Sequence, residues 1–171
     1  MSRRALAAAL ACAAMGALMG APGLAHAATA ADTIVLPARV PAQCVQTAAQ
    51  RYDVPEMLII AIVKQESDGH PVVSRNRNGS YDIGIAQINT NSWAPFLRRR
   101  YGISFDALVN DPCQALMAQA YILRRIANNQ CDGAVLWCAV GYYHSPTPSL
   151  QRQYIRDVYR RYEAIIDRGH F

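Results

Sequence analysis

The sequence has no internal repeat, no low-complexity tract and no periodic set of strands. These absences exclude repeat proteins, long disordered chains and all-β sandwiches or barrels. The sequence also has no CxxC pair and no closely spaced histidines, which argues against a zinc site. Lysine is nearly absent, since Lys64 is the single lysine and arginine supplies the other basic residues. Apolar residues recur mostly at helical spacing, so we predict a mainly α-helical protein.

The first 27 residues have the composition of a signal peptide. Arg3 and Arg4 precede an uncharged run over residues 5–24, and Ala25-His26-Ala27 forms a small-x-small cleavage site. A transmembrane anchor is the alternative, because the run approaches the roughly 20 residues that span a bilayer. Glycines and Pro22 in the run favour cleavage. We therefore expect export to a bacterial periplasm, with no stable membrane anchor after cleavage.

The mature chain has the size of one domain. Removing 27 of the 171 residues leaves 144, and the loss of two arginines lowers the net charge from +5 to +3. We expect a loosely ordered lead-in over residues 28–41 and one domain over residues 42–171. The basic excess fits an anionic polymer such as peptidoglycan, and it fits nucleic acid or an acidic membrane equally well. We interpret Arg98-Arg99-Arg100 as a solvated helix end.

Four cysteines remain once Cys12 leaves with the signal peptide. In an oxidising compartment they predict two disulfides, for which the sequence allows three pairings. We favour Cys131–Cys138, which closes a short loop. The other pair, Cys44–Cys113, would tie the first helix to the middle of the chain. Zinc binding is the weak alternative.

Helical patterns cover most of the mature chain, with one segment of turn formers between them. The predicted helices span 42–52, 54–67, 91–101, a segment that follows Asp111, 134–143 and 150–166. Asp53 and Glu56 suggest a capping box for the second of these, and Asp111 with Pro112 at the next position suggests a cap for the fourth. The segment 69–81 is predicted to be a loop, with a possible small hairpin at Asn78-Gly79.

Glu66 lies at the end of the second predicted helix. Ile59, Ile62 and Val63 precede it by seven, four and three residues, so all four share one face. A carboxyl group on an apolar face is desolvated, which raises its pKa toward the range a general acid needs. The alternative is that the helix ends early and Glu66 is solvated or paired with an arginine. Geometry alone leaves these two interpretations open.

Two further clusters could form a binding cleft with Glu66. Gly84 stands beside an apolar run, which fits close approach of a ligand to the backbone. Gln87 and Asn89 carry amides that can bind sugar hydroxyl and acetamido groups. Tyr143, followed by His144, offers an aromatic face for sugars and a phenol that could hold a carboxyl group. Each cluster alone is explained equally well by core packing.

Taken together, these clusters resemble the soluble lytic transglycosylases of the lysozyme-like superfamily. The family pattern of Glu-Ser, Gly-Leu-Met-Gln and Ala-Tyr-Asn appears here as Glu66-Ser67, Gly84-Ile85-Ala86-Gln87 and Tyr142-Tyr143-His144. A family tyrosine in the last helix matches Tyr154. The resemblance covers residues 42–162 and implies a single lysozyme-like domain with a small hairpin or loop beside the active-site cleft.

A narrower resemblance concerns the segment 76–89 and the Asp-Pro-Cys at residues 111–113. Both are similar to the small transglycosylases encoded with type III and type IV secretion machines. Those enzymes open gaps in peptidoglycan, so the resemblance implies peptidoglycan strands and secretion-system components as partners. It implies a monomer that needs neither metal nor cofactor and does not bind nucleic acid.

The resemblance also implies roles for individual residues. Glu66 would be the catalytic acid, and the residues around the substrate would be Ser67, Gly84, Gln87, Asn89, Tyr143, His144 and Tyr154, with Tyr154 orienting Glu66. Two positions depart from the family. Ala86 replaces methionine, which should trim an apolar wall of the cleft, and His144 replaces asparagine, which puts a sugar contact in doubt.

A second carboxylate would decide between two reactions. Related goose-type hydrolases carry aspartate two residues after the motif glutamine, where this chain has Asn89. This difference favours transglycosylation, in which Glu66 acts alone and a 1,6-anhydro ring forms. The alternatives are a muramidase that uses Asp82 or Asp68 as its base, and a non-catalytic peptidoglycan-binding assembly factor. A secreted toxin or inhibitor has only the cysteines in its favour.

Overall fold

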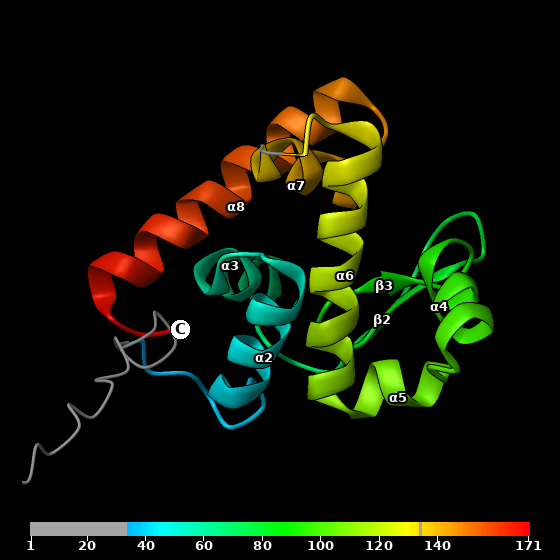
Figure 1. Ribbon diagram of the computed structural model, residues 1–171, viewed down its shortest axis with the longest axis horizontal. Helices are drawn as coiled ribbons and strands as arrows, with labels where there is room; N and C mark the ends of the chain where they lie inside the picture. Colours follow the sequence, from blue (N-terminus) through cyan, green and yellow to red (C-terminus); the bar gives the residue numbers. More distant parts are fainter. Residues whose placement is uncertain (1–33, 134) are drawn as a thin grey trace, which may run out of the picture.

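The computed structural model describes residues 34–133 and 135–171, so the predicted signal peptide and residues 28–33 lie outside the described part. The described chain is mainly helical with one small antiparallel sheet, as predicted (Figure 1). The helices are α2 (Ala42–Tyr52), α3 (Glu56–Ser67), α4 (Trp93–Tyr101), α5 (Phe105–Asn110), α6 (Pro112–Gln130), α7 (Leu136–His144) and α8 (Pro148–Arg168). The strands are β1 (Val73–Arg75), β2 (Tyr81–Ile83) and β3 (Ile88–Asn89).

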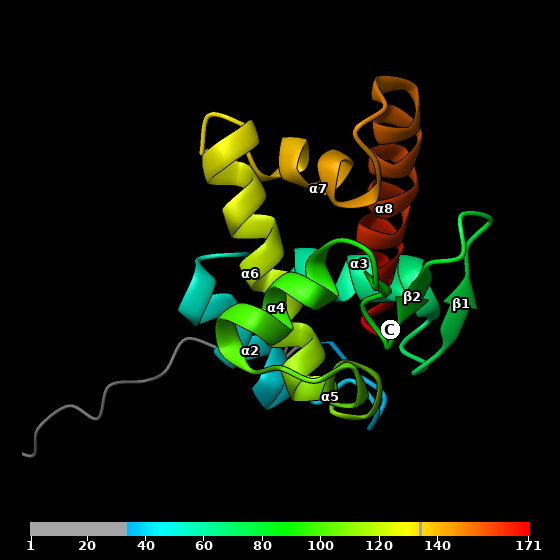
Figure 2. The same cartoon turned by 90° about the vertical axis from the view of Figure 1, so that its right-hand side faces the viewer.

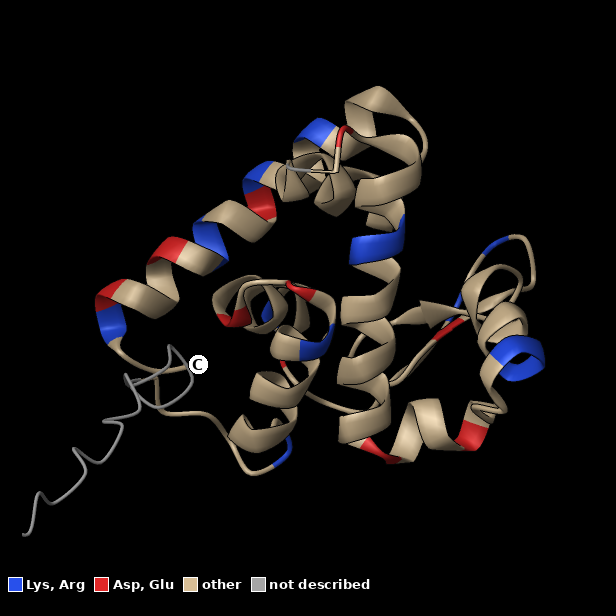
Figure 3. Ribbon diagram, viewed as in Figure 1, with Lys and Arg blue, Asp and Glu red and all other residues tan. Residues whose placement is uncertain are grey.

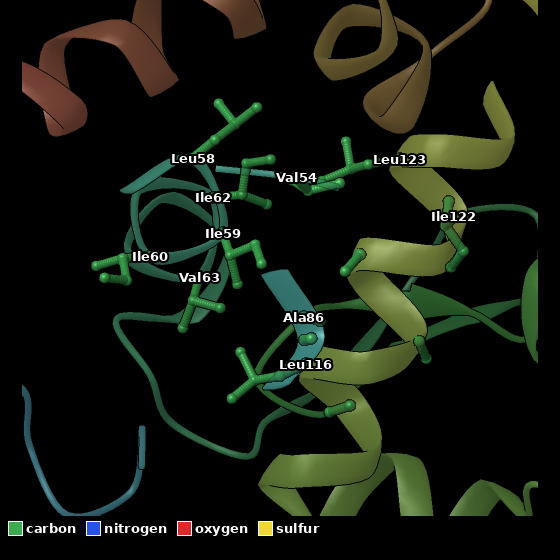
Figure 4. Close-up of a cluster of buried hydrophobic side chains, with 14 of the residues drawn as sticks. Val54, Leu58, Ile59, Ile60, Ile62, Val63, Ala86, Leu116, Ile122 and Leu123 are labelled. Atoms are coloured by element: carbon green, nitrogen blue, oxygen red, sulfur yellow. The ribbon is translucent and has the colours of Figure 1, made fainter. Parts of the chain in front are cut away.

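Helix α3 lies at the centre of the core. Residues 57–63 are all buried, so this helix is enclosed on every side rather than along one stripe. Helix α3 packs against α2, α6 and α8, and α6 also contacts α5 and α7. Figure 4 shows Ile59 and Val63 of α3 on the side of Leu116 of α6, with Ala86 between the two helices. Beyond this buried stretch, Glu56 at the start of α3 and the last turn, which carries Glu66, are partly exposed.

The sheet is a β1–β2 hairpin with β3 on the other side of β2. The hairpin turn spans residues 76–80, with Gly79 in the left-handed region at φ 81°, which confirms the predicted turn. Figure 2 shows the β1–β2 hairpin projecting at one side of the molecule. Sheet and helices meet where α4 contacts β3 and α5 contacts β2. Neither β3 nor α5 was predicted, because both are too short to show a hydrophobic period.

Of the two predicted helix N-caps, the one for α6 is present and the one for α3 is not. Asp111 accepts hydrogen bonds from the backbone N–H groups of Cys113 and Gln114 at 2.9 and 3.1 Å, which confirms it as the cap of α6. The prediction for Asp53 was wrong. Its backbone is left-handed (φ 51°, ψ 51°) and closes α2, whereas an N-cap needs an extended backbone. Helix α3 begins one residue after Pro55.

The predicted lead-in is packed against the domain where the structure describes it. Val40 is fully buried, and Val35 forms a parallel bridge with His170 near the C-terminus. Arg39 donates to the backbone oxygen of Asp68 at 3.0 Å. The expectation of loose order is therefore wrong for residues 34–41, because apolar side chains at Val40 and Ile34 join the core.

Both predicted disulfides are present. Cys44–Cys113 joins α2 to α6, and Cys131–Cys138 joins the residue after α6 to α7. Charged residues of both signs are spread along α8, while three arginines close α4 (Figure 3). These three side chains are exposed, which confirms the predicted solvated helix end. No helix within residues 34–133 and 135–171 has the length and apolarity to span a membrane.

Candidate active site

A cleft of about 470 Å³ lies between the end of α3, the hairpin and the α7–α8 turn. Five of the predicted site residues line it: Glu66, Gln87, Asn89, Tyr143 and His144. Its other lining residues are Asn76, Asp82, Ile88, Ser92, Trp93, Ile122, Tyr142, Ser145, Pro146 and Leu150. The structure therefore brings together motifs that are separated by up to 78 residues, from Glu66 to His144.

Glu66 is held by a tyrosine from the far end of the chain. The phenol of Tyr154, on α8, donates a hydrogen bond to Glu66 Oε1. Burial raises the pKa of the Glu66 carboxyl from 4.5 to about 7, the bond from Tyr154 opposes this rise, and the charge of Asp82 adds to it. Burial also raises the pKa of Tyr154 well above 10, so its phenol stays protonated. Glu66 can thus carry a proton near neutral pH.

Removing the Tyr154 hydroxyl should raise the pKa of Glu66 further. The phenol stabilises the charged carboxylate, so Tyr154→Phe takes away the one interaction that lowers this pKa. We expect the pKa of Glu66 to rise by roughly 0.5 to 1 pH unit, because a hydrogen bond to the charged carboxylate contributes about 1 kcal/mol. NMR titration of the ¹³C-labelled glutamate carboxyls measures it. A downward movement would contradict the assignment, and Tyr162→Phe on the same helix is the control.

Ser67 of α3 and Tyr143 of α7 hold the turn at residues 84–87 in place beside Glu66. Ser67 Oγ donates to the backbone oxygen of Ile85 at 2.7 Å, and Tyr143 Oη donates to that of Ala86 at 2.6 Å. Both donor hydrogens are therefore engaged with the protein backbone. We expected these residues to position sugar or carboxyl groups, and the observed contacts are those of residues that shape the cleft.

In the structure a glycine is required at position 84 because of a protein contact, whereas we predicted the approach of a ligand. Its φ is +74°, and a Cβ built on it would lie 1.9 Å from the backbone oxygen of Leu108 in α5. The segment that comes close to Gly84 is thus α5 and not a ligand, and Gly84 is absent from the cleft lining. Gln87 does line the cleft. Its Nε2 donates to the backbone oxygens of Val72 (3.1 Å) and Gly84 (2.8 Å), so its side-chain oxygen is the atom that could accept from a sugar.

Asp82 faces the same cleft and is fixed by two amides. Asn89 Nδ2 donates to Asp82 Oδ1 at 2.7 Å, and Asn76 Nδ2 donates to Oδ2 at 3.0 Å. The side-chain oxygen of Asn89 accepts from the backbone N–H of Asn91 at 2.8 Å. Asn89 therefore serves the hairpin and Asp82, which leaves it little capacity for the sugar contact we predicted. Asp82 is the second carboxylate of the cleft, together with Glu66.

Two other residues named in the predictions, Asp68 and Ala86, lie outside the cleft lining, and one cleft residue was not predicted. Asp68, the other candidate base, ends α3 in an exposed position, where it pairs with Lys64 outside the cleft lining. Ala86, where the family has methionine, is fully buried in the core and is not among the residues that line the cleft (Figure 4). Trp93 lines the cleft and was not predicted. The only signal in the sequence was a large aromatic residue directly after a polar run.

No metal site accompanies the two carboxylates. Within the described part of the chain, no group of three or more His, Cys, Asp or Glu side chains is placed to hold a metal ion. The acid–base groups that line the cleft are the carboxyl groups of Glu66 and Asp82, the imidazole of His144 and the phenols of Tyr142 and Tyr143. This set suits acid–base cleavage of a glycosidic bond.

Comparison with known proteins gives the same family as the motifs. The profile of the transglycosylase SLT domain matches residues 43–164. Protein IpgF of Shigella flexneri is 34% identical over 129 residues, which cover 72% of this chain and 82% of that protein. Invasion protein IagB of Salmonella typhimurium (strain SL1344) is 30% identical, with coverages of 72% and 78%. X polypeptide of Escherichia coli (strain K12) is 31% identical, with coverages of 71% and 73%. The chain therefore belongs to the transglycosylase SLT domain family.

Proposed function

We propose that this protein is a lytic transglycosylase of peptidoglycan. It would cleave the β-1,4 bond between N-acetylmuramic acid and N-acetylglucosamine and leave 1,6-anhydromuramic ends. The observation that carries the proposal is the state of Glu66, whose pKa is raised to about 7 by burial while Tyr154 fixes its position beside an open cleft. A carboxyl group of this kind can donate a proton at neutral pH and accept one back.

The reaction needs one carboxyl group used twice. Glu66 donates its proton to the bridging oxygen, the bond from that oxygen to the anomeric carbon breaks, and the N-acetylglucosamine side leaves as an alcohol. The positive charge at the anomeric carbon is shared with the substrate's own acetamido group. The Glu66 carboxylate then removes the proton of the muramyl C6 hydroxyl, and O6 bonds to the anomeric carbon. Glu66 is protonated again at the end of the cycle.

Asp82 gives a hydrolytic muramidase specific support as the second candidate. It lines the same cleft as Glu66, and its charge contributes to the raised pKa of Glu66. A carboxylate in this place could activate water as a general base. Under transglycosylation its charge would instead stabilise the positive anomeric carbon. The two amides that bind Asp82 support the electrostatic role, because they use one lone pair on each carboxylate oxygen.

The product separates the two candidates. We expect mass spectrometry of digested sacculi to find anhydro ends, both for the wild type and for Asp82→Asn. Because the neutral amide no longer stabilises the cationic centre, Asp82→Asn should release glycan about 100 to 1000 times more slowly, as for removal of a single electrostatic stabiliser. Reducing ends that disappear in Asp82→Asn would establish hydrolysis. Asp106→Asn, an exposed exchange on α5, is the matched control.

The biological setting follows from three features. The predicted signal peptide and the two disulfides support export to the periplasm, where peptidoglycan lies. A role in opening the cell wall for a secretion or conjugation apparatus is supported by the resemblance of residues 76–89 and 111–113 to secretion-associated transglycosylases, and the relative IagB is an invasion protein. A non-catalytic assembly factor is the remaining alternative. It would have no need for a buried acid at the cleft.

A further inference from the structure

His144 covers the tyrosine that binds the catalytic carboxyl. Its imidazole ring lies flat on the ring of Tyr154, with centroids 4.6 Å apart and planes 2° apart. Tyr154 is only 5% exposed, whereas His144 is exposed toward the cleft that it lines. The imidazole thus covers one face of the ring whose hydroxyl binds Glu66. Stacked rings of this kind restrict each other's position.

The packing of α7 against α8 fixes this stack. Gly141 lies one helical turn before His144, and a Cβ on it would come within 3.0 Å of Gln151 Cβ and 3.1 Å of Ile155 Cδ1. Glycine therefore permits the close approach of the two helices. The turn between them is held by Gln151 Nε2, which donates to the backbone oxygen of Ser145 at 3.0 Å. His144 is the last residue of α7, directly before this turn.

The surroundings of His144 favour the neutral ring, opposed by two acids. Burial lowers the pKa of the imidazole, while the charges of Asp82 on β2 and Asp157 on α8 raise it. The ring stacks on Tyr154, and the other titratable groups that line the cleft are Glu66 of α3 and the phenols of Tyr142 and Tyr143. Among the described residues that line this cleft, His144 alone has a basic side chain.

We propose that His144 is a positioning residue for the catalytic acid, which holds the Tyr154 phenol on Glu66 and shields that pair from water while its ring is neutral. This inference rests on the proposed function of Glu66. It assigns a purpose to a residue at which the chain departs from the family pattern. An asparagine there would have neither a ring to stack nor a charge to gain.

The proposal predicts a loss of activity at mildly acidic pH. Glu66 alone gives no such loss, because a carboxyl with a pKa of about 7 is fully protonated at pH 5. A protonated His144 would add a positive charge beside the anomeric carbon, where the transition state also becomes positive. We expect initial glycan release by the wild type to fall at least about fivefold as the pH is lowered from 7 through the protonation of His144, whose pKa burial places below 6.5, since like charges nearby oppose one another.

The test compares the ratio of activities at pH 5 and pH 7 among variants. His144→Phe keeps a flat ring that cannot be protonated, so its ratio should lie within about twofold of one. His70→Phe, the same exchange at an exposed histidine in the loop after α3, should keep the wild-type ratio. The proposal is overturned if His144→Phe shows the wild-type fall, or if the wild type shows no fall.

A second measurement does not depend on activity. In NMR titrations of labelled glutamate carboxyls, His144→Ala should lower the pKa of Glu66 by about 1. Water then reaches the pair, and the lost desolvation, which is the largest cause of the raised pKa, outweighs any loosening of the Tyr154 bond, which acts in the opposite direction. His144→Phe should leave that pKa near 7. An unchanged Glu66 pKa in His144→Ala would overturn the positioning role. If the wild type releases no glycan, the proposed function fails, and this titration still tests His144.

Discussion

Glu66→Gln should reduce the release of glycan from isolated sacculi by at least about a thousandfold, because a general acid contributes roughly 10² to 10⁴ and this one acts in two steps. The amide has the shape of the carboxyl group and can still accept the hydrogen bond from Tyr154. It has no proton to donate to the leaving oxygen, and it cannot take the proton of the C6 hydroxyl. Mass spectrometry of soluble muropeptides over a time course measures the effect.

The same substitution should make the protein more stable at alkaline pH. The pKa of Glu66 is about 7 in the folded protein and 4.5 as a free residue, so the folded state binds the proton more tightly. The stability that this proton provides is complete below pH 4.5 and is lost as the pH rises through 7. At pH 8 the free energy of unfolding is lower by about 3 kcal/mol for this reason, and Glu66→Gln avoids this loss because glutamine does not ionise. Urea unfolding at pH 8 and pH 4.5 should therefore show the larger gain for Glu66→Gln at pH 8.

These two results together exclude a trivial loss of fold. A variant that is inactive but unfolds at a higher urea concentration than the wild type at pH 8 has lost its catalytic acid and kept its fold. Glu163→Gln, the same exchange on the exposed face of α8, should change neither quantity. Equal glycan release by Glu66→Gln and wild type would show that Glu66 is not the acid. Equal pH dependence of stability would show that the carboxyl is not desolvated.

The sequence predicted those parts of the site that depend on local pattern. The helical spacing of Ile59, Ile62 and Val63 placed Glu66 at the end of an apolar face, and the structure confirms this position. It also confirms the pairing of the four cysteines. Helix α3 is more buried than its sequence pattern predicts. Whether a helix is covered on one face or on all sides depends on the other elements that pack against it, and the pattern does not contain them.

The remaining parts depend on contacts between distant segments, which a pattern does not contain. The role of Asn89 follows from its bond to Asp82, and that bond exists only because β3 pairs with β2. His144 meets Tyr154 because α7 and α8 approach each other closely at Gly141. Asp53 has the residue type of an N-cap, yet the backbone there is left-handed and ends the preceding helix. In each case the residue type was informative and its partner was not predictable.

Gly84→Ala should be the most destabilising single exchange among the glycines of the hairpin region. Two costs add at this position. The backbone is in the left-handed region at φ +74°, and the new Cβ would lie 1.9 Å from the backbone oxygen of Leu108. Leu108 is fully buried, so α5 cannot move without disturbing the core. We expect a loss of about 3 to 4 kcal/mol in the free energy of unfolding, roughly 1 from the backbone and the rest from overpacking.

Gly79→Ala separates the two costs. Gly79 has a similar backbone, with φ +81°, but nothing lies within 4 Å of the position of a Cβ. It should therefore lose only about 1 kcal/mol, the backbone cost alone. Urea unfolding of both variants at one pH gives the comparison. Equal losses would mean that α5 yields easily and that Gly84 is required for its φ alone. A much larger loss at Gly84 would mean that the close contact with α5 requires a glycine at this position, in addition to its backbone conformation.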